Sequence, residues 1–192
     1  MKTLYYVPMI HSKEEFGSLK DRIMQVQAEF YGKDGLDALL EEIDEYWDLV
    51  GSRIAEAGFF SPKAATLHIF VDGLPNSNKA VVDKIVEELT ASRRIPAYRI
   101  IKRLQKYGAT VHGTEDLSLL LEEYQYVKNL ADGRNTDADT ATAQNRLNAR
   151  DIAIARRIEE VMKNDGDVGM LFIGRMHDVI GKLSDEFTVI NL

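Results

Sequence analysis

The sequence predicts a single three-layer α/β/α domain with a mainly parallel sheet of about five strands. Three observations lead to this fold class. Short β-rich segments alternate with longer segments of helical periodicity, so helices join successive strands, as parallel pairing requires. The strand segments are mostly continuous apolar runs, which is typical of strands covered on both faces. The length of 192 residues suits one compact domain, so we expect residues 1–192 to form a single unit.

Five segments have the composition of short buried strands. Each is rich in β-branched, aromatic or other apolar residues and ends at a polar residue or a glycine. They cover residues 3–10, 66–71, 109–112, 168–173 and 187–191. Because few of them alternate between apolar and polar residues, we expect helices on both faces of the sheet.

Six segments between these strands show apolar residues spaced at three and four positions, as on one face of a helix. They cover residues 14–30, 36–54, 80–91, 97–106, 116–130 and 145–163. Left-handed C-terminal caps are expected at Gly32, Gly58, Gly108 and Gly166. The polar segment 132–143 has no periodicity and is predicted to be an exposed, flexible loop.

Charge and composition narrow the classes of function. The chain has 31 acidic and 24 basic residues, and its net charge of −7 disfavours nucleic acid and anionic membranes as partners. The local basic segment at residues 93–106 lacks the interleaved aromatic residues that stack on bases. No cysteine is present, which excludes disulfides, thiolate metal sites and cysteine nucleophiles. Neither a signal peptide nor a long apolar run is found, so a cytoplasmic protein is expected.

Polar residues gather at the ends of the predicted strands. His11 follows the first strand, Asp72 the second and His177 the fourth, while His112 ends the third. The carboxyl ends of parallel strands meet at one edge, where ligands of open α/β sheets bind. We therefore expect these four residues along one edge, although each histidine could equally cap a loop. His68 lies inside the second strand and is predicted to be a half-buried packing residue.

The segment 171–179 is the most informative in the chain. An apolar strand ends at Gly174 and is followed by Arg175 and His177. Arginine binds carboxylates or phosphates, and histidine ligates metals or transfers protons near neutral pH. The predicted helix 145–163 runs antiparallel to the strand 168–173 that follows it, so the start of the helix lies near the carboxyl end of the strand. Arg150 and Asp151 are therefore expected to approach His177. The alternative is that both are solvated helix residues.

Two short polar segments have a functional and a structural interpretation. In Asp72-Gly73-Leu74-Pro75 the carboxylate of Asp72 could bind a metal or orient a histidine, or it could stabilise a turn. In the segment 113–116, Thr114 and Asp116 are predicted to cap the following helix. The role of Glu115 stays open between the cap and the site.

Residues 150–190 carry a pattern that resembles a known superfamily. Arg150-Asp151, Ala155 and Ile158 precede a strand ending in Gly174 and His177, and a closing strand follows at residues 187–190. This resembles the C-terminal portion of the TraB/Tiki and erythromycin-esterase-like superfamily, which implies a hydrolase. Of that superfamily's N-terminal glycine/glutamate/histidine motif, residues 8–11 keep only the histidine. The whole chain also resembles a conserved family of prokaryotic α/β proteins through residues 10–12, 72–75, 113–116 and 120–124, which implies no function.

Two hypotheses of function follow. The first is a hydrolase acting on a small or peptide-like substrate, with or without a divalent metal ion held by His11 and His177. Its catalytic candidates are His11, His177, Asp72 and Glu115, and its substrate-binding candidates are Arg150, Asp151, Arg175 and His112. The second is a non-catalytic binding or regulatory module that holds a small anionic metabolite through Arg150 and Arg175. A homo-oligomer formed through the face of the helix containing Trp47 is a further hypothesis, set against burial of that face in the core.

Overall fold

The centre of the molecule is a parallel β-sheet. The computed structural model describes residues 1–10, 20–91, 95–131 and 140–192. Within these residues five strands form one sheet in the order β3-β2-β4-β1-β5, and every neighbouring pair is parallel. The strands are β1 (Lys2–Met9), β2 (Leu67–Pro75), β3 (Thr110–Glu115), β4 (Val168–Gly174) and β5 (Phe187–Asn191). The predicted α/β fold is confirmed, and the sheet is wholly rather than mainly parallel.

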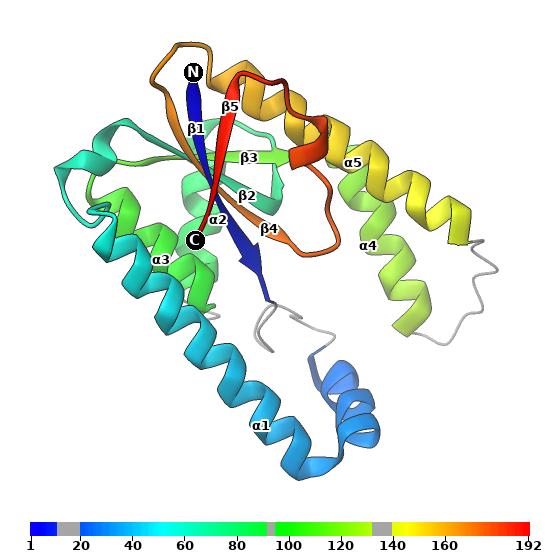
Figure 1. Cartoon of the computed structure of the whole chain (residues 1–192). Coiled ribbons are helices and arrows are strands. Elements are labelled where there is room, and N and C mark those ends of the chain that lie inside the picture. Colours follow the sequence, from blue (N-terminus) through cyan, green and yellow to red (C-terminus); the bar gives the residue numbers. More distant parts are fainter. Residues whose placement is uncertain (11–19, 92–94, 132–139) are drawn as a thin grey trace.

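Helices cover both faces of this sheet (Figure 1). One face packs against α1 (Lys20–Glu56), α2 (Lys79–Ala91) and α3 (Pro96–Lys106), and the other against α5 (Thr140–Val161), with α4 (Leu117–Ala131) beside α5. Two short 3₁₀ helices, η2 (Pro62–Thr66) and η3 (Ile180–Lys182), complete the described elements. Within the described residues, which leave out 14–19, the predicted helical segments are therefore confirmed, with shifted ends.

The helix α1 differs most from the prediction, because it joins two segments that we expected to be separate helices. Gly32 interrupts the helical geometry with φ 71° and ψ 168°, and no atom lies within 4 Å of the position that a Cβ would take. A glycine adopts this positive φ without steric cost, so a single residue kinks the helix. Gly58, Gly108 and Gly166 also have positive φ, as predicted.

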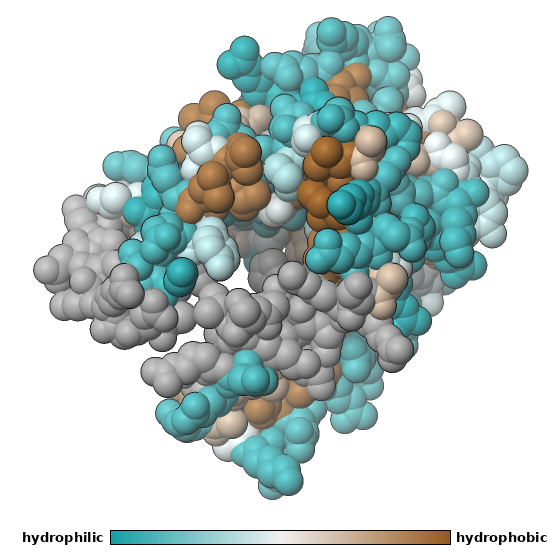
Figure 2. All heavy atoms as spheres, turned by 180° about the vertical axis from the view of Figure 1, so that it is seen from behind, coloured by the Kyte–Doolittle hydropathy of each residue, from teal (hydrophilic) through white to brown (hydrophobic). Residues whose placement is uncertain are grey.

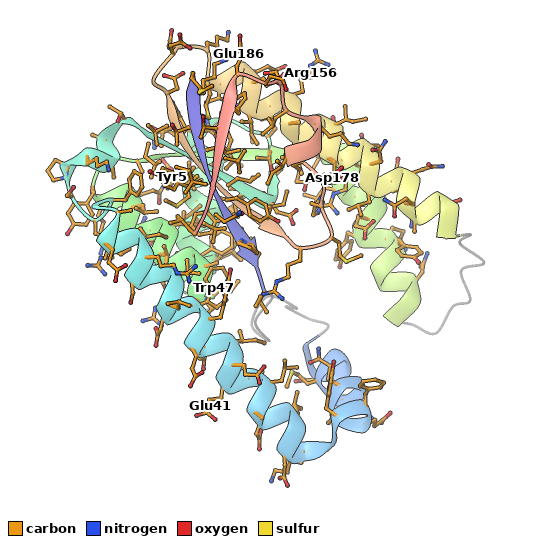
Figure 3. The ribbon with its side chains drawn as sticks, viewed as in Figure 1. Tyr5, Glu41, Trp47, Arg156, Asp178 and Glu186 are labelled. Carbon is orange, nitrogen blue, oxygen red and sulfur yellow. The ribbon has the colours of Figure 1, made fainter. Side chains whose placement is uncertain are left out.

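The second half of α1 packs on the sheet. Figure 3 shows Trp47 on the side of α1 that faces the strands, whereas Glu41 points away from them. Trp47 is 3% exposed and lies in the core, and its indole nitrogen donates to the carbonyl oxygen of Ile10 at 3.2 Å. The face of this helix is thus buried within the chain itself.

The helix α5 begins earlier than predicted. Residues 140–143, which we expected in a loop, belong to this helix, and the rest of the predicted loop, residues 132–139, lies outside the described residues. Ala141 and Ala143 have the highest helix propensity of any residue type, and this outweighs the polar composition of the segment.

The exterior is mainly hydrophilic. In the view from behind, hydrophilic side chains cover most of the coloured surface, and hydrophobic ones form separate patches (Figure 2). Of the helices in the described part of the chain, none combines the length and the apolar character needed to cross a bilayer.

The order of the strands creates a crevice at the carboxyl edge of the sheet. The central strand β4 is buried on both faces and lies between β2 and β1. The chain leaves β1 and β2 for helices on one face, whereas β4 is followed by η3 on the face of α5. Connections that diverge from neighbouring strands leave space between them, and ligands bind there in open α/β sheets.

Candidate active site

A cavity of about 790 Å³ lies at this carboxyl edge. Its volume falls within the range of roughly 300–1,000 Å³ typical of small-molecule sites. The described residues that line it follow β1, β2 and β4 or come from the helices around them: Met9, Ile10, Asp72, Gly73, Leu89, Ile95, Tyr98, Glu123, Leu147, Arg150, Gly174, Arg175, Met176 and His177. A second hollow of about 410 Å³ lies between α1 and α3, but the buried ionisable groups described next adjoin the first.

Arg150 holds two carboxylates on the floor of the cavity. Its Nη2 donates to Asp72 Oδ1 at 2.9 Å and to Glu115 Oε1 at 2.7 Å, and its Nε donates to Glu115 Oε2 at 3.2 Å. The side chains of Glu115, Asp72 and Arg150 are 0%, 9% and 11% exposed. Such charge-assisted bonds to a planar guanidinium fix both carboxylates in place.

His177 lies between two carboxylates. Its Nδ1 is 2.5 Å from Asp151 Oδ1, and its Nε2 is 3.4 Å from Asp72 Oδ2. The backbone after β4 anchors both acids, since Gly174 N donates to Asp72 Oδ2 at 3.1 Å and Asp178 N donates to Asp151 Oδ2 at 2.9 Å. The orientation of the imidazole is therefore set by groups from β2, α5 and the segment after β4.

The neighbours of each group shift its pKa. Burial alone would lower the pKa of His177, but the hydrogen bonds and charge of Asp72 and Asp151 outweigh it and raise the pKa above 6.5. Burial alone would raise the pKa of Asp72, but His177 and Arg150 hold it well below its usual range. For Glu115, burial and the nearby charge of Asp72 raise the pKa despite Arg150. The two carboxylates thus favour the imidazolium form of His177 over the neutral ring.

The structure places His112 outside the lining of this cavity and inside a strand, rather than at the predicted strand end, and its role in substrate binding stays a prediction. The strand β3 continues to Glu115, and His112 lies opposite Phe70 of β2. The two strands pair again at Pro75 and Glu115 after a register shift, where the Pro75 carbonyl oxygen lies 1.9 Å from the position that a Cβ of Gly113 would take. As predicted, His68 is half-buried in the sheet.

His112 and His68 form a pair of their own on the α5 face of the sheet. His68 Nδ1 lies 3.1 Å from His112 Nε2, and the ring of His112 stacks on Phe70 with a centroid distance of 5.4 Å. Burial, with the nearby charges of His68 and Arg157, lowers the pKa of His112 to about 4. This histidine is therefore neutral at physiological pH.

Of the two predicted caps, one is confirmed and one is wrong. Asp116 Oδ1 accepts from Ser118 N at 2.9 Å and from Leu119 N at 3.3 Å, as an N-cap does. Thr114 instead is buried, and its hydroxyl donates to the carbonyl oxygen of Val71 at 2.9 Å. The extension of β3 carries Thr114 into the sheet and turns Glu115 toward Arg150.

The predicted residues thus divide into three groups. The structure brings together Asp72, Glu115, Arg150, Asp151 and His177. It leaves Arg175 exposed at the rim of the cavity and His112 outside it. His11 lies outside the described residues.

Sequence reasoning missed Tyr46 on α1. Its ring centroid lies 5.9 Å from Cζ of Arg175, and its hydroxyl donates to the carbonyl oxygen of Pro8. Burial raises the pKa of Tyr46, and Arg175 opposes this rise. The spacing of apolar residues had marked Tyr46 only as part of the helix face that packs on the sheet.

The metal-binding role predicted for His11 and His177 stays a prediction. Among the described residues, no group of three or more histidine, cysteine, aspartate or glutamate side chains is arranged to hold a metal ion. Both ring nitrogens of His177 face carboxylates, so this arrangement favours proton transfer over ligation. The second ligand of that prediction, His11, is not among those residues.

Comparisons of the chain with models of protein families, with curated proteins and with solved structures found no match. The resemblance of residues 150–190 to the TraB/Tiki and erythromycin-esterase-like superfamily therefore stays a prediction. The function has to be argued from the chemistry of the site.

Proposed function

We propose that this protein is a hydrolase of a small or peptide-like substrate and that His177 is its acid–base group. One observation carries the proposal: His177 lines the cavity while two carboxylates hold its ring. Catalytic acids and bases need a fixed orientation and a pKa near the working pH. Asp72 and Asp151 supply the fixed orientation at the wall of a cavity that a substrate can enter.

The two ring nitrogens suit different tasks. Asp151, 2.5 Å from Nδ1, would keep the proton on that nitrogen and stabilise the imidazolium, as the acid of a catalytic triad does. The contact of 3.4 Å between Nε2 and Asp72 is longer than a strong hydrogen bond, so Nε2 could exchange this partner for a water molecule or a substrate atom.

A hydrolytic cycle follows from these roles. Neutral His177 takes a proton at Nε2 from a water molecule, whose oxygen forms a bond to the carbonyl carbon of the substrate. The imidazolium then gives that proton to the leaving oxygen or nitrogen as its bond to the carbon breaks. The raised pKa of His177 keeps the imidazolium populated to higher pH than in a free histidine, and its basic form increases as the pH rises through that pKa.

Arg150 fits a positioning role better than the predicted role in substrate binding. Its Nε and Nη2 already donate to Asp72 and Glu115, and the resulting ion pairs fix Asp72 beside His177. Asp151 is likewise engaged with His177 and the backbone of Asp178. Both residues would act through His177 rather than on the substrate.

The test is a panel of chromogenic esters, anilides and small peptides, assayed with and without added zinc and manganese. We expect turnover by the native protein and a decrease in kcat/KM of about a hundredfold to ten-thousandfold in His177→Gln. The matched control is His112→Gln, which changes a histidine of the same sheet outside the cavity and should retain activity.

Equal turnover in His177→Gln and the native protein would contradict this assignment. Saturable binding of panel compounds without turnover would favour the alternative hypothesis, a non-catalytic module for a small metabolite. Activity that appears only with the added metal, and is lost in His177→Gln, would support the predicted metal-dependent form of the hydrolase.

A further inference from the structure

Each charged side chain that lines the cavity has a partner of opposite charge among the described residues, with one exception. Asp72 pairs with Arg150 at 2.9 Å, and His177 lies between Asp72 and Asp151. Glu123 lies 3.7 Å from Nε of Arg146. Arg175 also lines the cavity, yet it forms no ion pair with any described residue. An anionic group bound there would give Arg175 an ion-pair partner.

Arg175 is exposed at the rim of the cavity, with its guanidinium near an aromatic ring. It follows Gly174, the last residue of β4, and its guanidinium lies within the distance of a cation–π contact from the ring of Tyr46. The hydroxyl of Tyr46 in turn donates to the carbonyl oxygen of Pro8 in β1. This arrangement limits the positions of the guanidinium, so less entropy is lost when it binds an anion.

Most of the remaining wall is apolar. The apolar lining residues come from the carboxyl ends of β1 and β4 and from the helices α2, α3 and α5, including the N-cap of α3. Among the described residues they are Met9, Ile10, Leu89, Ile95, Tyr98, Leu147 and Met176. Of these residues, Met9, Ile95 and Tyr98 are already buried, whereas solvent reaches Ile10, Leu89, Leu147 and Met176. An apolar group of the ligand would cover this accessible part of the wall and remove it from water, which a small hydrophilic metabolite would not do.

We propose that the cavity binds an amphipathic anion, with an apolar chain or ring system against this wall and one carboxylate or phosphate group on Arg175. The inference rests on the proposed function in taking this cavity as the substrate site, and it adds the class of substrate. The substrate would be an ester or amide whose apolar part carries a single anionic group.

The experiment compares a charged probe with its neutral partner. The probes are 11-(dansylamino)undecanoic acid and its methyl ester, whose fluorescence reports binding; chromatography of the recovered probe verifies that the ester was not hydrolysed during the measurement. We expect the acid to bind more tightly than the ester, and Arg175→Gln to weaken binding of the acid about tenfold while binding of the ester is unchanged. Leu89→Gln, in the apolar wall, should weaken both probes, and Arg156→Gln, at an exposed position on α5, should weaken neither.

Displacement of the probe by decanoate and by decyl phosphate distinguishes the two head groups. Equal affinities of the acid and the ester, or an equal effect of Arg175→Gln on both, would overturn the inference, as would failure of the acid to bind. These outcomes leave the hydrolase assignment untouched, because that assignment fails only if His177→Gln retains turnover. Conversely, discrimination by Arg175 without any turnover supports the ligand class alone.

Discussion

Two histidines on neighbouring parts of one sheet have pKa values that shift in opposite directions. His177, beside the end of β4, has a raised pKa, whereas His112, inside β3, has a pKa of about 4. Burial lowers the pKa of both, so burial does not explain the difference. His177 faces two carboxylates, while His112 faces His68, the ring of Phe70 and the charge of Arg157. The neighbouring charges decide whether a buried histidine is an acid or a neutral packing residue.

The surroundings of His177 and of His112 also differ in the number of buried ion pairs that they contain. Around His177, four further ionisable side chains are buried and mutually paired: Asp72, Glu115, Arg150 and Asp151. Around His112, the imidazole contacts that of His68 and an aromatic ring. Removing one ion from the first region leaves an uncompensated buried charge, whereas the contacts of His112 with the described residues include no ion pair.

The largest effect is expected from Arg150→Met. This change leaves Asp72 and Glu115 buried without their cation, and breaking a buried ion pair in this way costs about 3–5 kcal/mol. The free energy of unfolding, measured by urea denaturation at neutral pH, should fall by that amount. The matched control is Arg157→Met on the same helix near His112, where the nearest ion pair, with Glu160, spans 3.7 Å and the arginine is 25% exposed.

The control should change stability by less than about 1 kcal/mol, as expected for a weak, partly exposed pair. If the two variants were equally stable, the buried ion pairs around Arg150 would not be the feature that separates the two regions.

Much of this architecture could be predicted because it depends on local patterns. Apolar runs and helical spacing predict the strands and helices, and the antiparallel run of a helix before a strand predicts that α5 brings Asp151 to His177. The approach of Asp72 to the same histidine follows from the common edge of parallel strands. These inferences need only the direction of each element.

The partners of individual side chains could not be predicted, since they depend on register. The strand β3 pairs with β2 as far as Glu115, across a register shift between Val71 and Pro75, so Glu115 faces Arg150 while His112 stays inside the sheet. The pairing of Arg150 with two carboxylates, rather than with a ligand, depends on the same register. No spacing in the sequence indicates how far two strands continue to pair.

The second prediction is that His177 and His112 contribute to the stability of the protein with opposite pH dependences. The folded-state pKa of His177 is raised, so its contribution to stability is present below pH 6.5 and is lost as pH rises through that pKa. His112 has a folded-state pKa of about 4, below 6.5, so its contribution is present above pH 6.5 and is lost as pH falls toward 4. We expect His177→Gln to destabilise the protein more in mild acid than in alkali. His112→Gln should reduce the loss of stability between pH 6.5 and 4 by about 1 kcal/mol, since solvent screens this half-exposed site.

Urea denaturation of both variants across this pH range gives the measurement. The native protein is the reference at each pH, because carboxylates elsewhere titrate equally in all three proteins. Parallel pH profiles for the two variants would contradict the opposite pKa shifts.

The smallest effect is expected from His68→Gln. This variant separates the effect of burial on the pKa of His112 from the effect of the charge of His68. Burial is the larger cause of its low pKa, and the nearby charge of His68 is a lesser one. Removing the second imidazole should therefore raise the pKa of His112, while burial keeps it below 6.5. Titration of the imidazole resonances by NMR measures this change, with His177 in the same spectra as the internal control. A His112 pKa that returned fully to 6.5 would make the charge of His68, rather than burial, the cause of the contrast between the two regions.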